Sequence, residues 1–301
     1  MPTRPAPLTH ASPTSDNQMA LPDGRTLGWT QSGDRHGAPL LWFHGSPSSR
    51  LDAAPGGPYS DALTAAGVRL IGFDRPGYGL STSHPDRTLL TVAGDVAALA
   101  DALELDRFAV AGWSGGGPMA LATAALLGSR VTGVALLASI APAALVDATD
   151  LAEAALFSLA GSDPAALTEL LGGLAQLMRD DPLGAAWQML GEHLAETDLT
   201  AVSDPAYAAA MAASLGESAR QDLLGYAQDL AGLAASWPFT CDQVHQSVVL
   251  VHGRADRIVP LRHGQALAAA LPDAALQTTD DGHLSVIAHL PALATTLLGS
   301  P

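Results

Sequence analysis

The sequence FAVAGWSGGGPMALATAALL, residues 108–127, decides the fold. It begins with an apolar run that predicts a strand, and Gly116–Leu127 predicts a buried helix. Between them, GWSGG at residues 112–116 has the pattern G-x-S-x-G, which in a strand–turn–helix context is typical of a nucleophilic serine. Small residues let the strand and the helix approach closely, and the free N–H groups at the helix start favour negative charge. We therefore expect Ser114 to be a nucleophile.

A nucleophilic serine needs a general base. Among the ten histidines, His283 is the best candidate, because it follows both a glycine and the extended run Ala274–Thr279 and precedes a predicted helix. His44 and His252 also precede loops, but each stands before a glycine at a strand end, where turn formation explains it. We therefore expect His283 to be the base.

The base in turn needs an acid to orient it. Asp256 follows a predicted apolar strand by five residues, and a loop of that length can reach across the strand ends. Asp280 and Asp281 are closer to His283 in sequence, but neighbouring residues seldom orient the ring correctly, so we interpret them as part of a polar turn. With Asp256 as the acid, the chain order is serine, acid, histidine.

A loop near the N-terminus supplies the candidate oxyanion hole. The residues HGSP, 44–47, follow the predicted strand Pro39–Phe43. In folds with this elbow, one donor is the N–H after the nucleophile and another comes from such an early loop. We therefore expect the N–H groups of Gly115 and Ser46 to be the two donors of the oxyanion hole, since Pro47 has no N–H.

The rest of the chain alternates short apolar strands with longer helical stretches, which predicts an α/β protein with a doubly wound, mostly parallel sheet. A hairpin is expected over Met19–Gly33, and further strands at Val68–Phe73, Val131–Ala138 and Val248–Val251; helices are expected at Leu89–Leu105, His263–Leu271 and Leu284–Leu298. Residues 1–16 are expected to form a flexible tail, residues 17–142 and 239–301 the core, and residues 143–238 a helical insertion without a good strand.

Composition excludes several classes of function. The 301 residues are 48% hydrophobic and carry a net charge of −16, which opposes binding to nucleic acid or to anionic lipid. All 14 basic residues are arginine, so Schiff-base chemistry and a phosphate-loop lysine are excluded. Cys241 is the single cysteine, and no residues have metal-ligand spacing, so we expect neither a metal nor a cofactor. With no long apolar run and no secretory signal visible, we expect no membrane span and a cytoplasmic location.

With these motifs the chain resembles the α/β-hydrolase superfamily from about Met19 to Leu298, with the insertion in the lid position. The resemblance implies the roles already given for Ser114, Asp256 and His283, with Ser46 and Gly115 as oxyanion donors. The segment GFDRPGYGLS, residues 72–81, resembles the superfamily's turn after an early strand and is interpreted as structural, with Asp74 or Arg75 as possible site residues.

The sequence also departs from several members. Trp113 stands where lipases and esterases often have histidine, and we take it as a candidate substrate-binding residue. The chain lacks the Gly-Gly-Ser-Trp-Gly elbow of proline iminopeptidases, which argues against that activity. A serine at 114 argues against the dehalogenases and epoxide hydrolases, whose nucleophile is a carboxylate.

The function expected is therefore a cofactor-independent serine hydrolase that cleaves a small or medium carboxylic ester through an acyl-enzyme. A carbon–carbon bond hydrolase, an amidase and a perhydrolase share the same triad, and a non-catalytic binding module on this fold is a further alternative. Residues 143–237 carry 14 acidic residues and 2 arginines, so we expect neutral substrates unless these acids all face away from the site.

Overall fold

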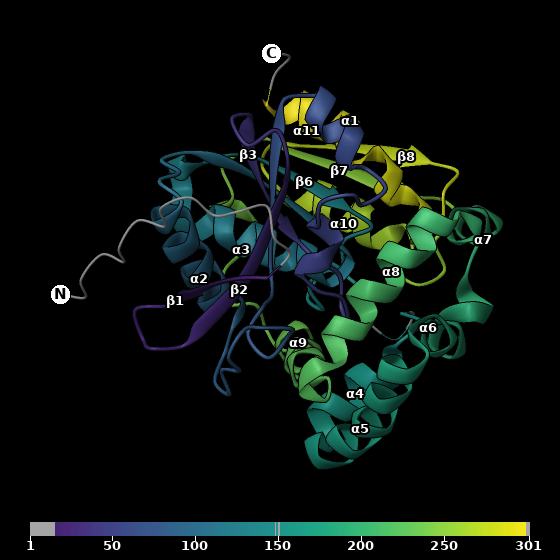
Figure 1. The fold of residues 1–301 in the computed structure, drawn as a ribbon. Coiled ribbons are helices and arrows are strands. Elements are labelled where there is room, and N and C mark those ends of the chain that lie inside the picture. The colour runs from purple at the N-terminus through teal and green to yellow at the C-terminus, as the bar shows by residue number, and fades with distance from the viewer. Residues whose placement is uncertain (1–15, 148, 150, 299–301) are drawn as a thin grey trace.

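An eight-stranded sheet forms the centre of the computed structural model, which describes residues 16–147, 149 and 151–298 (Figure 1). The strand order is β1-β2-β4-β3-β5-β6-β7-β8. The strands are β1 (Asn17–Ala20), β2 (Thr26–Gly33), β3 (Ala38–Phe43), β4 (Val68–Phe73), β5 (Phe108–Trp113), β6 (Val131–Leu137), β7 (Val248–Gly253) and β8 (Ala274–Thr279). Strand β2 runs antiparallel to both β1 and β4, and the remaining pairs are parallel. This arrangement confirms the predicted doubly wound, mostly parallel sheet and the N-terminal hairpin.

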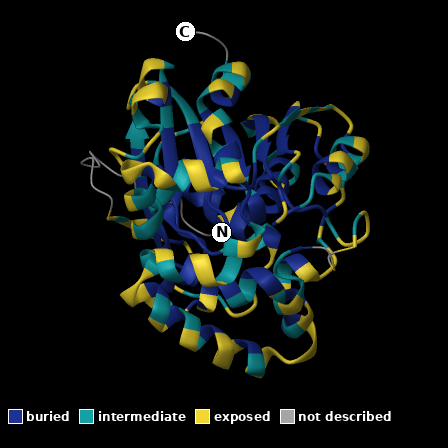
Figure 2. Cartoon of the chain, turned by 90° about the vertical axis from the view of Figure 1, so that its right-hand side faces the viewer, coloured by how far each residue is buried: buried dark blue, intermediate teal, exposed yellow. Residues whose placement is uncertain are grey.

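Helices cover both faces of the sheet, and this explains why the central strands are apolar throughout. One core packs against α2 (Leu89–Ala102), α3 (Gly117–Leu127) and α10 (Arg262–Ala270), and the other against α1 (Ser60–Ala65) and α11 (Leu290–Leu298). Neighbouring residues of β3 alternate between them: Leu41 belongs to the first core and Trp42 to the second. Figure 2 shows these strands as the most deeply buried part of the molecule.

Three local predictions need correction. Leu284–Leu298 is not one helix but the 3-10 turn Ser285–His289 followed by α11, because Pro291 fits only the first turn of an α-helix. Helix α2 ends at Ala102, two residues before Glu104 takes a positive φ of 56°. Helix α1 was not anticipated, since it is six residues long and buries only Leu63.

Between β6 and β7 the described residues form helices: α4 (Ala154–Ser162), α5 (Pro164–Asp180), α6 (Pro182–Leu190), α7 (Glu196–Ser203), α8 (Pro205–Ser218) and α9 (Leu224–Ala234). These helices lie at one side of the sheet (Figure 1). Three of them, α5, α6 and α8, begin with an Asp-Pro pair in which the aspartate side chain accepts backbone N–H groups. Proline is well placed at the first helical position, so these prolines start helices rather than interrupt them.

Of the predicted tail, residues 1–15 lie outside the described part of the chain. Within that described part, no helix has both the length and the apolar character needed to cross a membrane.

Close packing at the turn after β5 gives a testable prediction. A Cβ added to Gly116 would lie 2.2 Å from the carbonyl oxygen of Phe43. We expect Gly116→Ala to lower the free energy of unfolding by about 1–3 kcal/mol, because backbone atoms would have to shift. Gly94→Ala is the control: Gly94 is exposed on α2 with no atom within 4 Å of an added Cβ, so alanine should stabilise by up to about 1 kcal/mol. Urea unfolding measures both, and equal effects would contradict the packing argument.

Candidate active site

The nucleophile candidate stands on a strained turn. Ser114 follows β5 directly and has a φ of +53°, a conformation that non-glycine residues seldom adopt. The turn is also tight: a Cβ on Gly112 would lie 2.7 Å from the carbonyl oxygen of Gly116. The two glycines therefore allow the close approach that lifts the serine out of the strand and places it at the start of the following helix.

The structure brings the three predicted triad residues together. The Nε2 atom of His283 lies 3.0 Å from Ser114 Oγ, and its Nδ1 lies 2.8 Å from Asp256 Oδ2. The other oxygen of Asp256 accepts the backbone N–H groups of Ile258 and Val259, each at 2.9 Å. These contacts keep the aspartate in place. With Nδ1–H donating to Asp256, Nε2 is free to accept the serine hydroxyl.

Burial and charge act in opposite directions on the pKa values of this site. Ser114, His283 and Asp256 are 8%, 3% and 5% exposed. Burial lowers the pKa of His283, but the charge of Asp256 and its hydrogen bond outweigh that effect and raise the pKa above 6.5. Burial likewise raises the pKa of Asp256, and the histidine reverses the shift to a net lowering. The pair thus favours a charged carboxylate and stabilises an imidazolium.

The alternative acids have other partners. Asp281 Oδ2 lies 2.8 Å from Nε2 of His289, and Asp280 accepts from Arg254 at 3.0 Å. Neither contacts the ring of His283, whose described carboxylate partner is Asp256.

A carboxylate of the insertion holds the loop that carries the base. Asp198 on α7 is 1% exposed, and its side chain accepts the backbone N–H groups of His283, Leu284 and Ser285 at 2.9–3.1 Å. It also accepts from the Ser285 hydroxyl at 3.0 Å. No local pattern points to Asp198, because these partners lie more than 80 residues along the chain.

The loop with the candidate oxyanion donors is held by a buried arginine. Arg75 donates to the carbonyl oxygens of His44 and Gly45, the latter at 2.9 Å. In a trans peptide the C=O and the following N–H point in opposite directions, so the N–H of Ser46 faces away from Arg75. Ser46 and Gly115 are direct neighbours, since a Cβ on Gly115 would lie 2.6 Å from Ser46 Oγ. The two predicted donors are therefore brought side by side.

Arg75 in turn pairs with a carboxylate of the insertion. Asp229 on α9 accepts from Arg75 at 2.5 Å, from Tyr78 OH at 2.6 Å and from Ser46 Oγ at 2.5 Å, and it also binds Arg87. Burial raises the pKa of Asp229, but the two arginines more than reverse that shift and hold the pKa well below its usual range. The carboxylate is thus charged at any ordinary pH and joins the insertion to the oxyanion loop.

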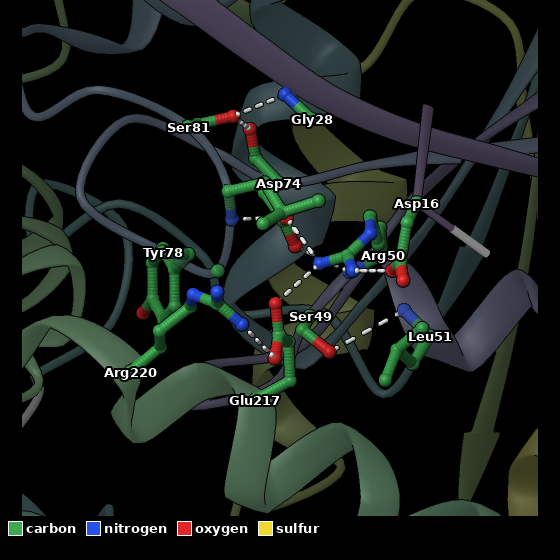
Figure 3. Close-up of polar contacts among 12 residues, drawn as sticks. Asp16, Gly28, Ser49, Arg50, Leu51, Asp74, Tyr78, Ser81, Glu217 and Arg220 are labelled. Atoms are coloured by element: carbon green, nitrogen blue, oxygen red, sulfur yellow. Dashed lines mark hydrogen bonds and ion pairs between the residues drawn. The ribbon is translucent and has the colours of Figure 1, made fainter. Parts of the chain in front are cut away.

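The residue before Arg75 belongs to a second buried ion cluster (Figure 3). Asp74 accepts the Arg50 guanidinium at 2.7 Å and the Arg50 backbone N–H at 2.8 Å. The same guanidinium binds Glu217 of α8 at 2.7 Å and Asp16 near the N-terminus at 2.5 Å. Neither Asp74 nor Arg75 lines the cavity beside Ser114. Both instead attach helices of the insertion to the core.

A small cavity of about 50 Å³ lies between the core and the insertion. Ser114, His283 and Ser46 line it on the core side, and its walls are mostly apolar, with Met178, Met189, Leu190, Met211, Leu215 and Ile258. Trp113 also lines it, donates its indole N–H to the carbonyl oxygen of His283 at 3.1 Å, and lies against the imidazole with 5.3 Å between ring centres.

One carboxyl group, missed from the sequence, also lines this cavity. Glu153, just before α4, accepts a hydrogen bond from Tyr226 OH. Burial raises its pKa, and the tyrosine and the nearby His283 only partly offset that rise. No group of three or more His, Cys, Asp or Glu residues that could hold a metal ion occurs among the residues described here.

Residues 38–290 match the family model of the alpha/beta hydrolase fold. The chain belongs to this family. It is 33% identical over 121 residues to a proline iminopeptidase from Xanthomonas citri, a match that covers 38% of this chain and only 36% of that relative. The similarity holds although the elbow sequence of the chain differs from the one expected for such peptidases.

Solved structures share the fold of this α/β hydrolase. A hydrolase from Pseudomonas aeruginosa PA01 has a TM-score of 0.71 at 22% identity, covering 95% of this chain and 98% of that one. The enol-lactonase from Burkholderia xenovorans LB400 has a TM-score of 0.67 at 21% identity, covering 93% and 98%. At such identities the likeness shows the fold alone.

The raised pKa of His283 predicts the pH dependence of serine reactivity. Only the neutral imidazole can accept the serine proton, so a raised pKa moves the loss of reactivity to higher pH. We expect the rate at which a fluorophosphonate labels Ser114 to rise with pH and reach its midpoint above 6.5. Asp256→Asn should lower both the midpoint and the maximal rate, whereas His289→Gln should change neither. A wild-type midpoint below 6.5 would contradict the proposed pairing.

The buried Asp229 cluster predicts a separate effect. Asp229→Asn removes the negative charge that pairs with the two buried arginines Arg75 and Arg87, so we expect a loss of about 3–5 kcal/mol in the free energy of unfolding. At a temperature where the variant is folded, kcat for a test ester should fall at least about tenfold with little change in KM, because displaced oxyanion donors act only in the transition state. The control is Asp222→Asn, because Asp222 is an exposed partner of Arg179 in the same insertion. This variant should leave the free energy of unfolding and kcat unchanged. A purely structural Asp229 would lower stability and leave kcat unchanged.

Proposed function

We propose that this α/β hydrolase is a cofactor-independent serine hydrolase that cleaves neutral carboxylic esters through an acyl-enzyme. One observation carries the proposal: Ser114, His283 and Asp256 form a continuous hydrogen-bonded chain, at 3.0 and 2.8 Å, on the wall of a mostly apolar cavity. A serine activated by a histidine and a carboxylate is the arrangement that acyl transfer needs.

The proposed reaction has two halves. Ser114 Oγ attacks the ester carbonyl while its proton passes to Nε2 of His283, and the N–H groups of Ser46 and Gly115 stabilise the oxyanion. The imidazolium then gives its proton to the leaving alkoxide, and an alcohol departs. In the second half His283 takes a proton from water, the hydroxide attacks the acyl-enzyme, and the carboxylic acid is released with Ser114 regenerated.

The walls of the cavity support a neutral substrate. They are dominated by methionine and leucine side chains, and the one acidic wall residue, Glu153, would repel an anionic group. The enol-lactonase with the same fold acts, by its name, on a lactone, which is a cyclic ester. That likeness supports an ester only as far as a shared fold can.

An amidase acting on a substrate with a free amine is the second candidate. Glu153 favours it, because a carboxylate beside Ser114 and His283 could pair with an ammonium group of the substrate. The partial similarity to a proline iminopeptidase agrees with this reading. The two candidates share the triad and differ in the group that Glu153 faces.

A substrate panel with triad variants tests both candidates. We expect p-nitrophenyl acetate and butyrate to be cleaved by the wild type and to lose at least about 10³-fold in kcat in Ser114→Ala and in His283→Ala, with the double variant little worse than either, since the triad acts as a unit. Prolyl p-nitroanilide is the competing substrate. If it exceeds both esters in kcat/KM and Glu153→Gln removes that preference, the amidase replaces the esterase as our conclusion.

A further inference from the structure

A second chamber adjoins the cavity beside Ser114. It has a volume of about 80 Å³ and lies between α1 and the segment before it, helix α8, and the turn after His283. The two spaces share Pro47, Trp113, Met211, Leu215 and Leu284 as walls. These shared side chains make the two spaces neighbours, so a substrate chain that extends from Ser114 into the chamber would pass Trp113 and Met211.

The walls of this chamber are mostly apolar and include one charged group. Leu63, Leu70, Ile287 and Leu290 line it, whereas Asp52 is the one charged residue among those that form its surface. Two hydroxyl groups, of Ser48 and Ser214, lie beside this carboxylate within the same chamber. Ser32, Ser60, Tyr59 and Tyr207 also line the chamber, so Asp52 is its one charged acceptor among several polar groups.

The carboxylate of Asp52 has spare capacity for a hydrogen bond. Its Oδ1 accepts the Ser48 hydroxyl at 2.8 Å, while its Oδ2 lies 3.5 Å from the indole Nε1 of Trp42, too far for a full hydrogen bond. Burial raises the pKa of Asp52, and hydrogen bonds from Ser214, Ser48 and Trp42 do not restore it to its usual value. Asp52 is half-buried, and a carboxylate can accept more hydrogen bonds than these, so a ligand donor could form a charge-assisted contact with it.

We propose that this chamber binds one side of the substrate ester, and that it selects an apolar chain ending in a hydrogen-bond donor that reaches Asp52. The inference rests on the ester hydrolysis proposed above and adds the substrate class. An apolar chain gains from contact with the leucine walls, and its terminal donor pairs with the half-buried carboxylate of Asp52. A chain with a terminal carboxylate would be rejected by Asp52.

The probe should be a neutral donor, because the net charge of −16 attracts any cation without reference to Asp52. Two ester series cover both sides of the scissile bond. The acyl series pairs ethyl butanoate, hexanoate and octanoate with their ω-hydroxy forms, and the alcohol series pairs the acetates of hexanol and 1,6-hexanediol. Hydrolysis of each, and of ethyl acetate, is followed by acid release at constant pH.

In one of the two series we expect the wild type to prefer the hydroxy ester over its methyl-ended partner by about tenfold in kcat/KM. Asp52→Ala should reverse that preference, because the hydroxyl then enters an apolar chamber without a partner. Ala210→Phe, which places a ring in the chamber from α8, should lower the ratio of six-carbon ester to ethyl acetate by about tenfold. The matched control is Ala209→Phe, at an exposed position on the same helix.

Each failure has its own reading. Equal ratios in the Ala210→Phe and Ala209→Phe proteins would overturn binding of substrate in the chamber. A hydroxyl preference that is absent from the wild type, or that survives Asp52→Ala, would overturn the role of Asp52. If the Asp52→Ala protein does not fold, the wild-type preference still tests the role of Asp52, and Ala210→Phe still tests binding in the chamber. Wild-type protein that hydrolyses neither ethyl acetate nor any longer ester would instead overturn the proposed function itself.

Discussion

The ion pair between Arg75 and Asp229 is the contact on which the rest of the site depends. Both side chains are fully buried, so each charge would be very costly without the other. Arg75 holds the carbonyl groups of the loop that presents Ser46, and Asp229 comes from the insertion more than 150 residues later. One interaction thus sets both the orientation of the oxyanion loop and the position of helix α9.

Carboxylates join the core and the insertion at two other points as well. Asp74 binds Arg50, which reaches Glu217 on α8, and Asp198 on α7 holds the backbone of the loop that carries His283. The loops that carry His283 and Ser46 are therefore both held partly by Asp198 and Asp229 of the insertion. Residues of the segment between β6 and β7 thus contact both loops that carry candidate site residues.

These contacts revise the meaning of the acidic composition. The 14 acids of residues 143–237 predict a preference for neutral substrates unless they all face away from the site. Asp198 and Asp229 are each 1% exposed and point into the core, and Glu153 lines the cavity. Others, such as Asp163 and Asp204, cap helices. A few of these acids therefore have partners or positions inside the protein, whereas most of the other described acids of the segment are exposed to solvent.

The sequence by itself predicted the sheet, the strained turn at Ser114 and the grouping of Ser114 with Asp256 and His283, because strand periodicity, glycine spacing and chain order can be read along the chain. It could not determine the partners of Arg75, Asp198 or Asp52. Hydrogen bonds and ion pairs between residues far apart in the chain leave no local pattern, and an aspartate that caps a helix reads the same as one that is buried. Only the tertiary structure decided which acids face the core, where the second chamber lies and how the insertion completes the site, since burial and distance arise when the chain packs.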